Sequence, residues 1–146
     1  MIFTKVFDPV NRPTIEEKKA IVNFLHTHLE QYGDPKKHIE AAIDFSLKET
    51  ESFGGCTIIL QDNEDIKAAV VVNKTGMNGY IPENILVYIA TDKNSRGQGL
   101  GRQLMEKVIA ETEGDVALHV EANNPAKKLY EKLGFTNPYL EMRLKK

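Results

Sequence analysis

The spacing of hydrophobic positions changes several times along the chain, between the two-residue period of a strand and the 3.6-residue period of a helix. Residues 2–7 are rich in β-forming side chains and predict a first strand. Thr14 and Glu17 have the spacing of a capping box, and the apolar residues after them recur every three or four positions until Gly33. A helix is therefore expected between Thr14 and Gly33.

A second helix and a hairpin are expected next. Asp34 and Pro35 suit the N-cap and the first position of a helix whose apolar stripe continues to residues 53–55. Residues 56–61 and 66–73 are β-rich runs joined by a short acidic segment, which is typical of two antiparallel strands.

The second half of the chain alternates between strand and helix patterns. Residues 85–91 form a nearly unbroken apolar run, which predicts a central strand buried on both faces. A helix over 100–113 and a strand over 115–121 follow, and this order predicts a right-handed parallel crossover. A short helix from Asn124-Pro125 to Gly134 and a last strand over 139–144 complete the pattern. We expect one α/β domain over residues 1–146, with a mixed sheet.

The segment Arg96-Gly97-Gln98-Gly99-Leu100-Gly101, here called the glycine loop, joins the central strand to the next helix. Backbone N–H groups at a helix start lack intrahelical partners, and the helix dipole adds positive charge, so this turn predicts a phosphate site. The loop lacks the Gly-Lys-Ser/Thr ending of the nucleotide P-loop, and its glycine spacing differs from the dinucleotide fingerprint. A nucleoside triphosphate or NAD is disfavoured.

Composition narrows the function classes. The chain has 41% hydrophobic and 27% charged residues and a formal net charge of −2, which is the balance of a soluble globular protein. No run of like charges suggests a nucleic-acid surface, and no segment approaches the roughly 18 apolar residues of a membrane span. No secretory signal is visible, so a cytoplasmic protein is expected.

Neither cysteine nor histidine chemistry is indicated. Cys56 is the only cysteine and lies within a strand-like run, so a buried structural thiol is expected. The four histidines lack the spacing of a metal site, and we expect no metal.

Two motifs resemble one known family. The glycine loop is similar to the R/Q-x-x-G-x-G/A signature of the GCN5-related N-acetyltransferases (GNAT), and residues 123–135 are similar to that family's N-x-x-A-x-x-x-Y-E-K-x-G-F segment. The resemblance implies an α/β, GNAT-type acyl-CoA N-acyltransferase fold. Such a fold has a mixed central sheet of about six to seven strands, four flanking helices and a splayed parallel pair of strands at its centre.

The same resemblance implies acetyl-CoA as acyl donor and assigns the residues that would bind it. The pyrophosphate would lie on the amides from Arg96 to Arg102. The pantetheine arm would enter between strands 85–91 and 116–121 and pair with the main chain there. Arg96, Arg102, Lys127 and Lys128 are candidates to neutralise phosphates. The cofactor-binding residues implied are Ile89, Ala90, Thr91, Arg96, Gly97, Gln98, Gly99, Leu100, Gly101, Arg102, Asn123 and Tyr130.

Acyl transfer from a thioester to an amine requires a base, an oxyanion donor and a proton for the thiolate. Tyr130 matches the family's tyrosine, as general acid or as a ligand of the sulfur. A backbone N–H near residues 89–91 would bind the oxyanion. The glutamate that many members place on the strand before the glycine loop is missing, because Ile85 and Val87 occupy those positions. Glu83 is the candidate base, and the alternatives are Tyr88, His119, Glu121 or a water chain to solvent.

Two functions therefore stay open at this stage. The first is an acetyl-CoA-dependent N-acetyltransferase, which acts by direct attack in a ternary complex on a primary amine, with a small-molecule acceptor favoured. The second is a CoA-binding sensor or regulatory module without turnover. The family resemblance places the acceptor site against parts of residues 14–53 and 74–84, and it leaves a monomer or a homodimer possible.

Overall fold

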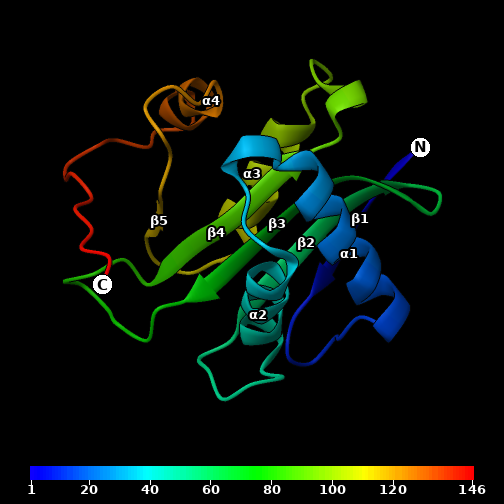
Figure 1. Ribbon diagram of the computed structural model, residues 1–146, viewed down its shortest axis with the longest axis horizontal. Coiled ribbons are helices and arrows are strands. Elements are labelled where there is room, and N and C mark those ends of the chain that lie inside the picture. Colours follow the sequence, from blue (N-terminus) through cyan, green and yellow to red (C-terminus); the bar gives the residue numbers. More distant parts are fainter.

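Five strands form one mixed sheet in the order of the sequence, and the computed structural model describes all of residues 1–146 (Figure 1). The first three neighbouring pairs are antiparallel and the last is parallel. The strands are β1 (Ile2–Phe7), β2 (Gly55–Asp62), β3 (Asp65–Lys74), β4 (Asn84–Thr91) and β5 (Val116–Leu118).

Helices cover both faces of this sheet, as Figure 1 shows. One core lies between the sheet and helices α1 and α2, and the other lies between the sheet and α3, with α4 at its margin. The helices are α1 (Ile15–His28), α2 (Lys36–Leu47), α3 (Leu100–Glu111) and α4 (Ala126–Lys132), with 3₁₀ turns η1 (Glu30–Tyr32) and η2 (Lys93–Ser95). None of the helices combines the length and the apolar character that a membrane crossing requires.

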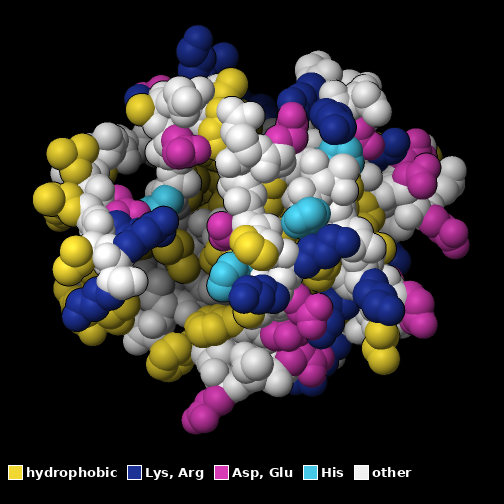
Figure 2. Space-filling view, viewed as in Figure 1, with side chains coloured by type: hydrophobic (Ala, Val, Ile, Leu, Met, Phe, Trp, Pro, Cys, Tyr) yellow, Lys and Arg dark blue, Asp and Glu magenta, His cyan; other side chains and the backbone are white.

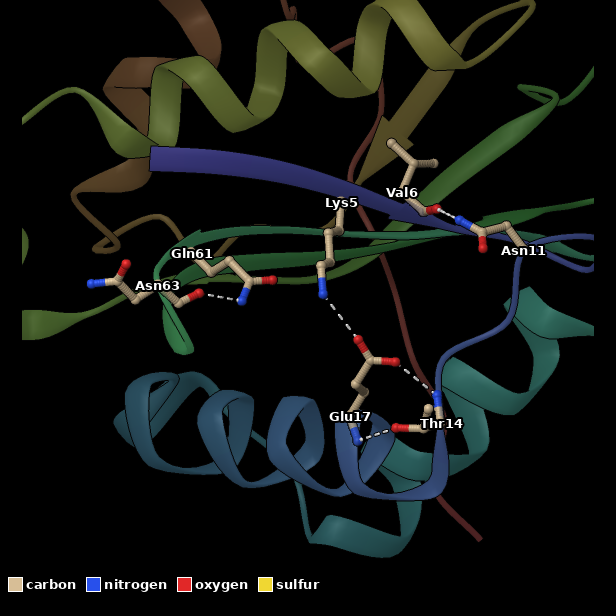
Figure 3. A network of polar contacts seen from close by, with 7 residues as sticks. All are labelled: Lys5, Val6, Asn11, Thr14, Glu17, Gln61 and Asn63. Atoms are coloured by element: carbon tan, nitrogen blue, oxygen red, sulfur yellow. Dashed lines mark hydrogen bonds and ion pairs between the residues drawn. The ribbon is translucent and has the colours of Figure 1, made fainter. Parts of the chain in front are cut away.

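The start of α1 shows how local sequence fixes an element (Figure 3). Glu17 N–H donates to the Thr14 hydroxyl at 3.1 Å, and Thr14 N–H donates to the Glu17 carboxylate at 2.9 Å, which confirms the capping box. Lys5 of β1 pairs with the same carboxylate at 3.1 Å. The hydrogen bond from the Thr14 backbone and the Lys5 ammonium lower the pKa of Glu17. This group therefore fastens α1 to the edge strand of the sheet.

Most predicted elements are confirmed, with shifts at their ends. The first strand, the hairpin and the strand–helix–strand unit with its parallel pairing are present. The second helix begins one residue later than predicted, because Pro35 is its N-cap and the Asp34 side chain does not cap it. The helix ends at Leu47, where Lys48 takes a left-handed conformation with φ of 57° and closes the last turn.

Two expectations about the sheet are wrong. It has five strands rather than six or seven, and residues 139–144 form no strand. Alternating apolar residues favour a strand only where a neighbouring strand supplies hydrogen-bond partners, and no strand pairs with this segment. Its apolar side chains are exposed and contribute to the hydrophobic side chains seen at one edge of the molecule in Figure 2, and they are Tyr139, Leu140, Met142 and Leu144.

Candidate active site

The parallel strands β4 and β5 are paired at one end and separate at the other. Pairing is restricted to Asn84 with Val116, Ile85 with Ala117 and Leu86 with Leu118. Strand β4 continues to Thr91 and keeps its pairing with β3, but β5 ends at Leu118. The predicted splayed pair is therefore confirmed, although β5 is shorter than the strand expected over 115–121.

A β-bulge lies where the two strands separate. Val71 pairs with Tyr88 and Val72 pairs with Leu86, so Val87 is the extra residue on β4. Leu86 packs into the core under α3, whereas Tyr88 packs into the core under α1 and α2. Residues two apart in a regular strand share a face, so the bulge places the side chains of Leu86 and Tyr88 on opposite faces of the sheet. It leaves Val87 37% exposed, which corrects the expectation of burial on both faces.

The space between the separated parts of β4 and β5 is here called the gap. At its closed end, where the two strands still pair, side chains hold the neighbouring loops together. Asn84 is buried, and its side-chain amide donates to the carbonyls of Glu113 and Asp115 at 2.7 and 3.1 Å. The Glu83 carboxylate accepts from the Asp115 N–H at 2.8 Å and from the Gly79 N–H at 3.1 Å. These backbone hydrogen bonds lower the pKa of Glu83. Glu83 stays a prediction as general base, but this geometry gives it a structural role and makes it a weaker base.

Replacement of Glu83 by glutamine is expected to lower the melting temperature at neutral pH, because glutamine presents one acceptor oxygen instead of two. Folding lowers the Glu83 pKa, so its stabilisation is present above the ordinary glutamate value of about 4.3 and is lost as the pH falls through the folded-state pKa. The difference in melting temperature between wild type and E83Q should shrink on acidification. Calorimetry measures it, and Glu113→Gln, an exposed neighbouring carboxylate, is the control. A difference that is independent of pH would contradict this role.

The backbone N–H groups of the glycine loop have no partners in the protein. From Arg96 to Arg102 no backbone N–H donates to another group of the chain, and the first donor in the helix is Gln103, bonded to the Gly99 carbonyl at 3.0 Å. The amides just before the loop are used, since those of Asn94 and Ser95 donate to Asp92 at 2.8 and 2.9 Å. A run of free amides at a helix start is suited to an anion with several oxygens.

Glycine is required in this loop by conformation. Gly97 and Gly99 have φ values of 86° and 76°, in the left-handed region that other residues avoid. A Cβ on Gly101 would lie 3.3 Å from the Leu129 side chain and 3.8 Å from that of Thr91. The first turn of α3 is therefore packed against both α4 and the end of β4.

Tyr130 of α4 belongs to the core between the sheet and α3. It is only 6% exposed and belongs to the same core cluster as Leu86, with its ring centroid 5.9 Å from that of Phe135. Burial alone raises the pKa of Tyr130 to about 12, and no hydrogen bond to another residue contributes. The phenol therefore stays protonated at neutral pH and keeps its proton available for a ligand.

Comparison with known families decides what this arrangement is. The sequence model of the acetyltransferase (GNAT) domain matches residues 53–137, which include the hairpin, the gap, the glycine loop and α4. The chain belongs to the GNAT family. As a member it is an N-acetyltransferase whose acyl donor is acetyl-CoA. A search of curated protein sequences finds no significant match.

Solved structures share the GNAT fold at low sequence identity. The ribosomal-protein-S18-alanine N-acetyltransferase of Escherichia coli superposes with a TM-score of 0.67 at 20% identity, over 94% of this chain and 80% of that one. A predicted acetyltransferase with acetyl-CoA from Clostridium acetobutylicum gives 0.66 at 17% identity, over 98% and 96%. The ribosomal-protein-alanine N-acetyltransferase of Brucella melitensis gives 0.66 at 10% identity, over 99% of both chains.

Three of the four cationic side chains that are candidates to bind phosphate in this GNAT protein are paired with carboxylates. Arg96 lies 2.7 Å from Glu30 of η1, and both side chains are well exposed. Arg102 pairs with Glu106 at 3.8 Å and Lys127 pairs with Glu131 at 3.8 Å, each one turn along its own helix. Exposed pairs of this kind contribute little to stability, so these cations can change partners at low cost. Lys128 is exposed and forms no ion pair.

The other candidates lie outside the core of this GNAT domain. His119, Glu121 and Asn123 follow β5 and are exposed. Cys56 is buried, as predicted, and burial raises the pKa of its thiol to about 11, so it is not a nucleophile. No cluster of three or more His, Cys, Asp or Glu side chains has the arrangement of a metal site.

One contact at the site was missed by the sequence reasoning. Tyr88, considered only as an alternative base, donates a hydrogen bond to Asp34, which the sequence pattern assigned to helix capping. The two residues are 54 positions apart. No local pattern predicts such a pair, because the fold alone brings the segment before α2 onto β4.

Proposed function

We propose that this chain acts as one catalytic domain that transfers the acetyl group of acetyl-CoA to a primary amine, most simply that of a small molecule, by direct attack in a ternary complex. The observation that carries the proposal is the run of unpartnered amides from Arg96 to Arg102 beside a gap between two parallel strands. The free amides suit the diphosphate of acetyl-CoA, and the gap suits the extended pantetheine arm attached to it.

The donor is proposed to bind along β4. The diphosphate would lie on the glycine-loop amides, with Arg96 and Arg102 exchanging their carboxylate partners for phosphate oxygens. The pantetheine arm would pair with the main chain of residues 89–91, where β4 has no β5 neighbour. Asn123, at the start of the segment that carries α4, would complete the site.

The transfer requires the amine to lose a proton before it attacks the thioester carbonyl carbon, because an ammonium with a pKa of about 10.4 has no free electron pair. A backbone N–H near residues 89–91 would stabilise the resulting oxyanion. Collapse of the intermediate breaks the C–S bond and expels the thiolate, and the nitrogen loses its second proton to solvent water to give the amide. We propose that Tyr130 donates a hydrogen bond to the thiolate and then its proton. Glu83 or a water chain to solvent would receive the amine proton.

The acceptor is proposed to enter from the side of α1, α2 and the loop before β4, opposite the face that carries α3. No extension that would dock a protein substrate is visible on that side, which favours a small molecule.

Buried Cys56 and the absence of a second cysteine are compatible with the proposed cytoplasmic location.

The test measures CoA binding and turnover separately. Calorimetry should detect CoA binding with an affinity that weakens with added salt, because phosphate contacts are electrostatic. Release of free thiol from acetyl-CoA should then be followed over a panel of primary amines, amino acids and peptides with free N-termini. Turnover of small amines supports the proposal, and turnover of peptides alone overturns the small-molecule part. CoA binding without turnover of any acceptor would overturn catalysis and favour the regulatory alternative.

A further inference from the structure

The connection between η1 and α2 is held on β4 by a side-chain hydrogen bond. The Tyr88 hydroxyl donates to the Asp34 carboxylate at 2.5 Å. Figure 1 shows this connection, in cyan, crossing in front of β4 on the side of α1 and α2. Tyr88 is 9% exposed, whereas Asp34 is exposed. One carboxylate oxygen is thus held by a buried phenol, on a residue that is itself exposed to solvent.

The local structure does not account for a carboxylate here. Asp34 precedes the N-cap of α2 and bonds to none of that helix's amides, since the cap is Pro35 and makes no side-chain hydrogen bond. No lysine, arginine or histidine lies within ion-pair distance of it, although ten ion pairs are formed elsewhere. A carboxylate that is oriented by a buried phenol and lacks a cation is suited to accept a cationic ligand.

The Tyr88–Asp34 pair lies at the part of β4 that borders the gap. Tyr88 directly follows the bulge residue Val87 and lies on the part of β4 that β5 does not cover. The bulge turns Tyr88 to the face of α1 and α2, while Tyr130 and the first turn of α3 lie on the opposite face. A thioester in the gap would have Tyr130 on one side and the Tyr88–Asp34 pair on the other.

We propose that Asp34 binds the ammonium group of the acceptor amine and that Tyr88 positions its carboxylate. This inference rests on the proposed function and adds the residue that binds the cationic acceptor. Burial and the hydrogen bond to Asp34 raise the pKa of Tyr88, so the phenol remains a donor and the carboxylate remains the acceptor. Asp34 is a binding residue, and Tyr88 is a positioning residue.

The experiment follows backbone amide NMR signals of the CoA-saturated protein during titration with benzylamine, 1,4-diaminobutane and neutral benzyl alcohol. The two amines should shift the signals of Gly33, Asp34, Lys36 and Tyr88, since residue 35 is a proline without a backbone N–H. Asp34→Asn keeps an oxygen for the Tyr88 hydroxyl but removes the charge, and a charge-assisted contact is strong enough that its loss should weaken both amines about tenfold. Benzyl alcohol should bind wild type and D34N equally. Tyr88→Phe, which keeps the charge but frees the carboxylate, should have a smaller effect.

Glu40→Gln is the matched control, because Glu40 is another exposed carboxylate, within α2, and its loss changes the net charge equally. Equal amine affinity in wild type and D34N, an equal loss in E40Q, or no shift at Gly33, Asp34 and Lys36 with either amine would each overturn the inference. The same samples test the proposed function separately. Failure of CoA to shift the Arg96–Arg102 amides would refute CoA binding itself, whereas normal CoA shifts with no amine response refute the Asp34 role alone.

Discussion

Replacement of Tyr130 by phenylalanine is expected to lower kcat about 100-fold and to leave the affinity for CoA unchanged, because a positioned proton donor contributes at least that factor to acyl transfer. Phenylalanine keeps the ring that packs against Phe135 and the α3 core, so only the hydroxyl is lost. The raised pKa of about 12 keeps that hydroxyl protonated across the working pH range. The loss should therefore appear in kcat and not in KM.

Steady-state kinetics on an acceptor from the amine panel, with CoA affinity from calorimetry, check this result. Tyr139→Phe is the matched control, since Tyr139 is 85% exposed in a segment without secondary structure. A kcat for Y130F within about twofold of wild type would exclude Tyr130 as proton donor. A lower CoA affinity with unchanged kcat would instead assign the hydroxyl to coenzyme binding.

Replacement of Gly99 by valine is expected to weaken CoA binding by about 10- to 100-fold. Gly99 has φ of 76° and is the N-cap of α3, and a β-branched residue there carries about 1–3 kcal/mol of backbone strain. The chain can relieve that strain only by leaving the left-handed conformation, which turns the neighbouring amides away from the anion. Binding should fall even though no CoA-contacting side chain has been removed.

Calorimetric titration with CoA measures this effect, and Gly79→Val is its control. Gly79 has φ of 85° and open space around its Cβ position, as Gly99 does, but it lies in the loop before β4. Both variants should lose stability, and only G99V should lose CoA affinity. Equal affinities in the two variants would mean that the glycine loop does not bind the diphosphate.

The features that local sequence determines were predictable, and the features that depend on pairing between distant segments were not. Thr14 and Glu17 are three residues apart and fix a helix start, and the glycines between a strand and a helix predict free amides. The bulge at Val87 depends on the register of β3 against β4, which no pattern within β4 reveals.

The same distinction explains the errors. Residues 139–144 have the alternation of a strand, but a strand also needs a partner, and the sequence pattern says nothing about partners. The short β5 has the same cause, because pairing with β4 ends at Leu118 while the apolar pattern continues. Asp34 was assigned to its nearest helix, whereas its hydrogen-bond partner lies 54 residues away.

Because β5 ends at Leu118, the inner strand β4 has an unpaired edge beyond Leu86. From Val87 to Thr91 the main chain of β4 has no strand beside it on that flank, so it can serve as a template for any extended polypeptide that reaches it. The pantetheine arm of CoA, if it lies along this part of β4, would cover the unpaired edge. The coenzyme-bound protein would therefore present less unpaired strand edge than the empty protein.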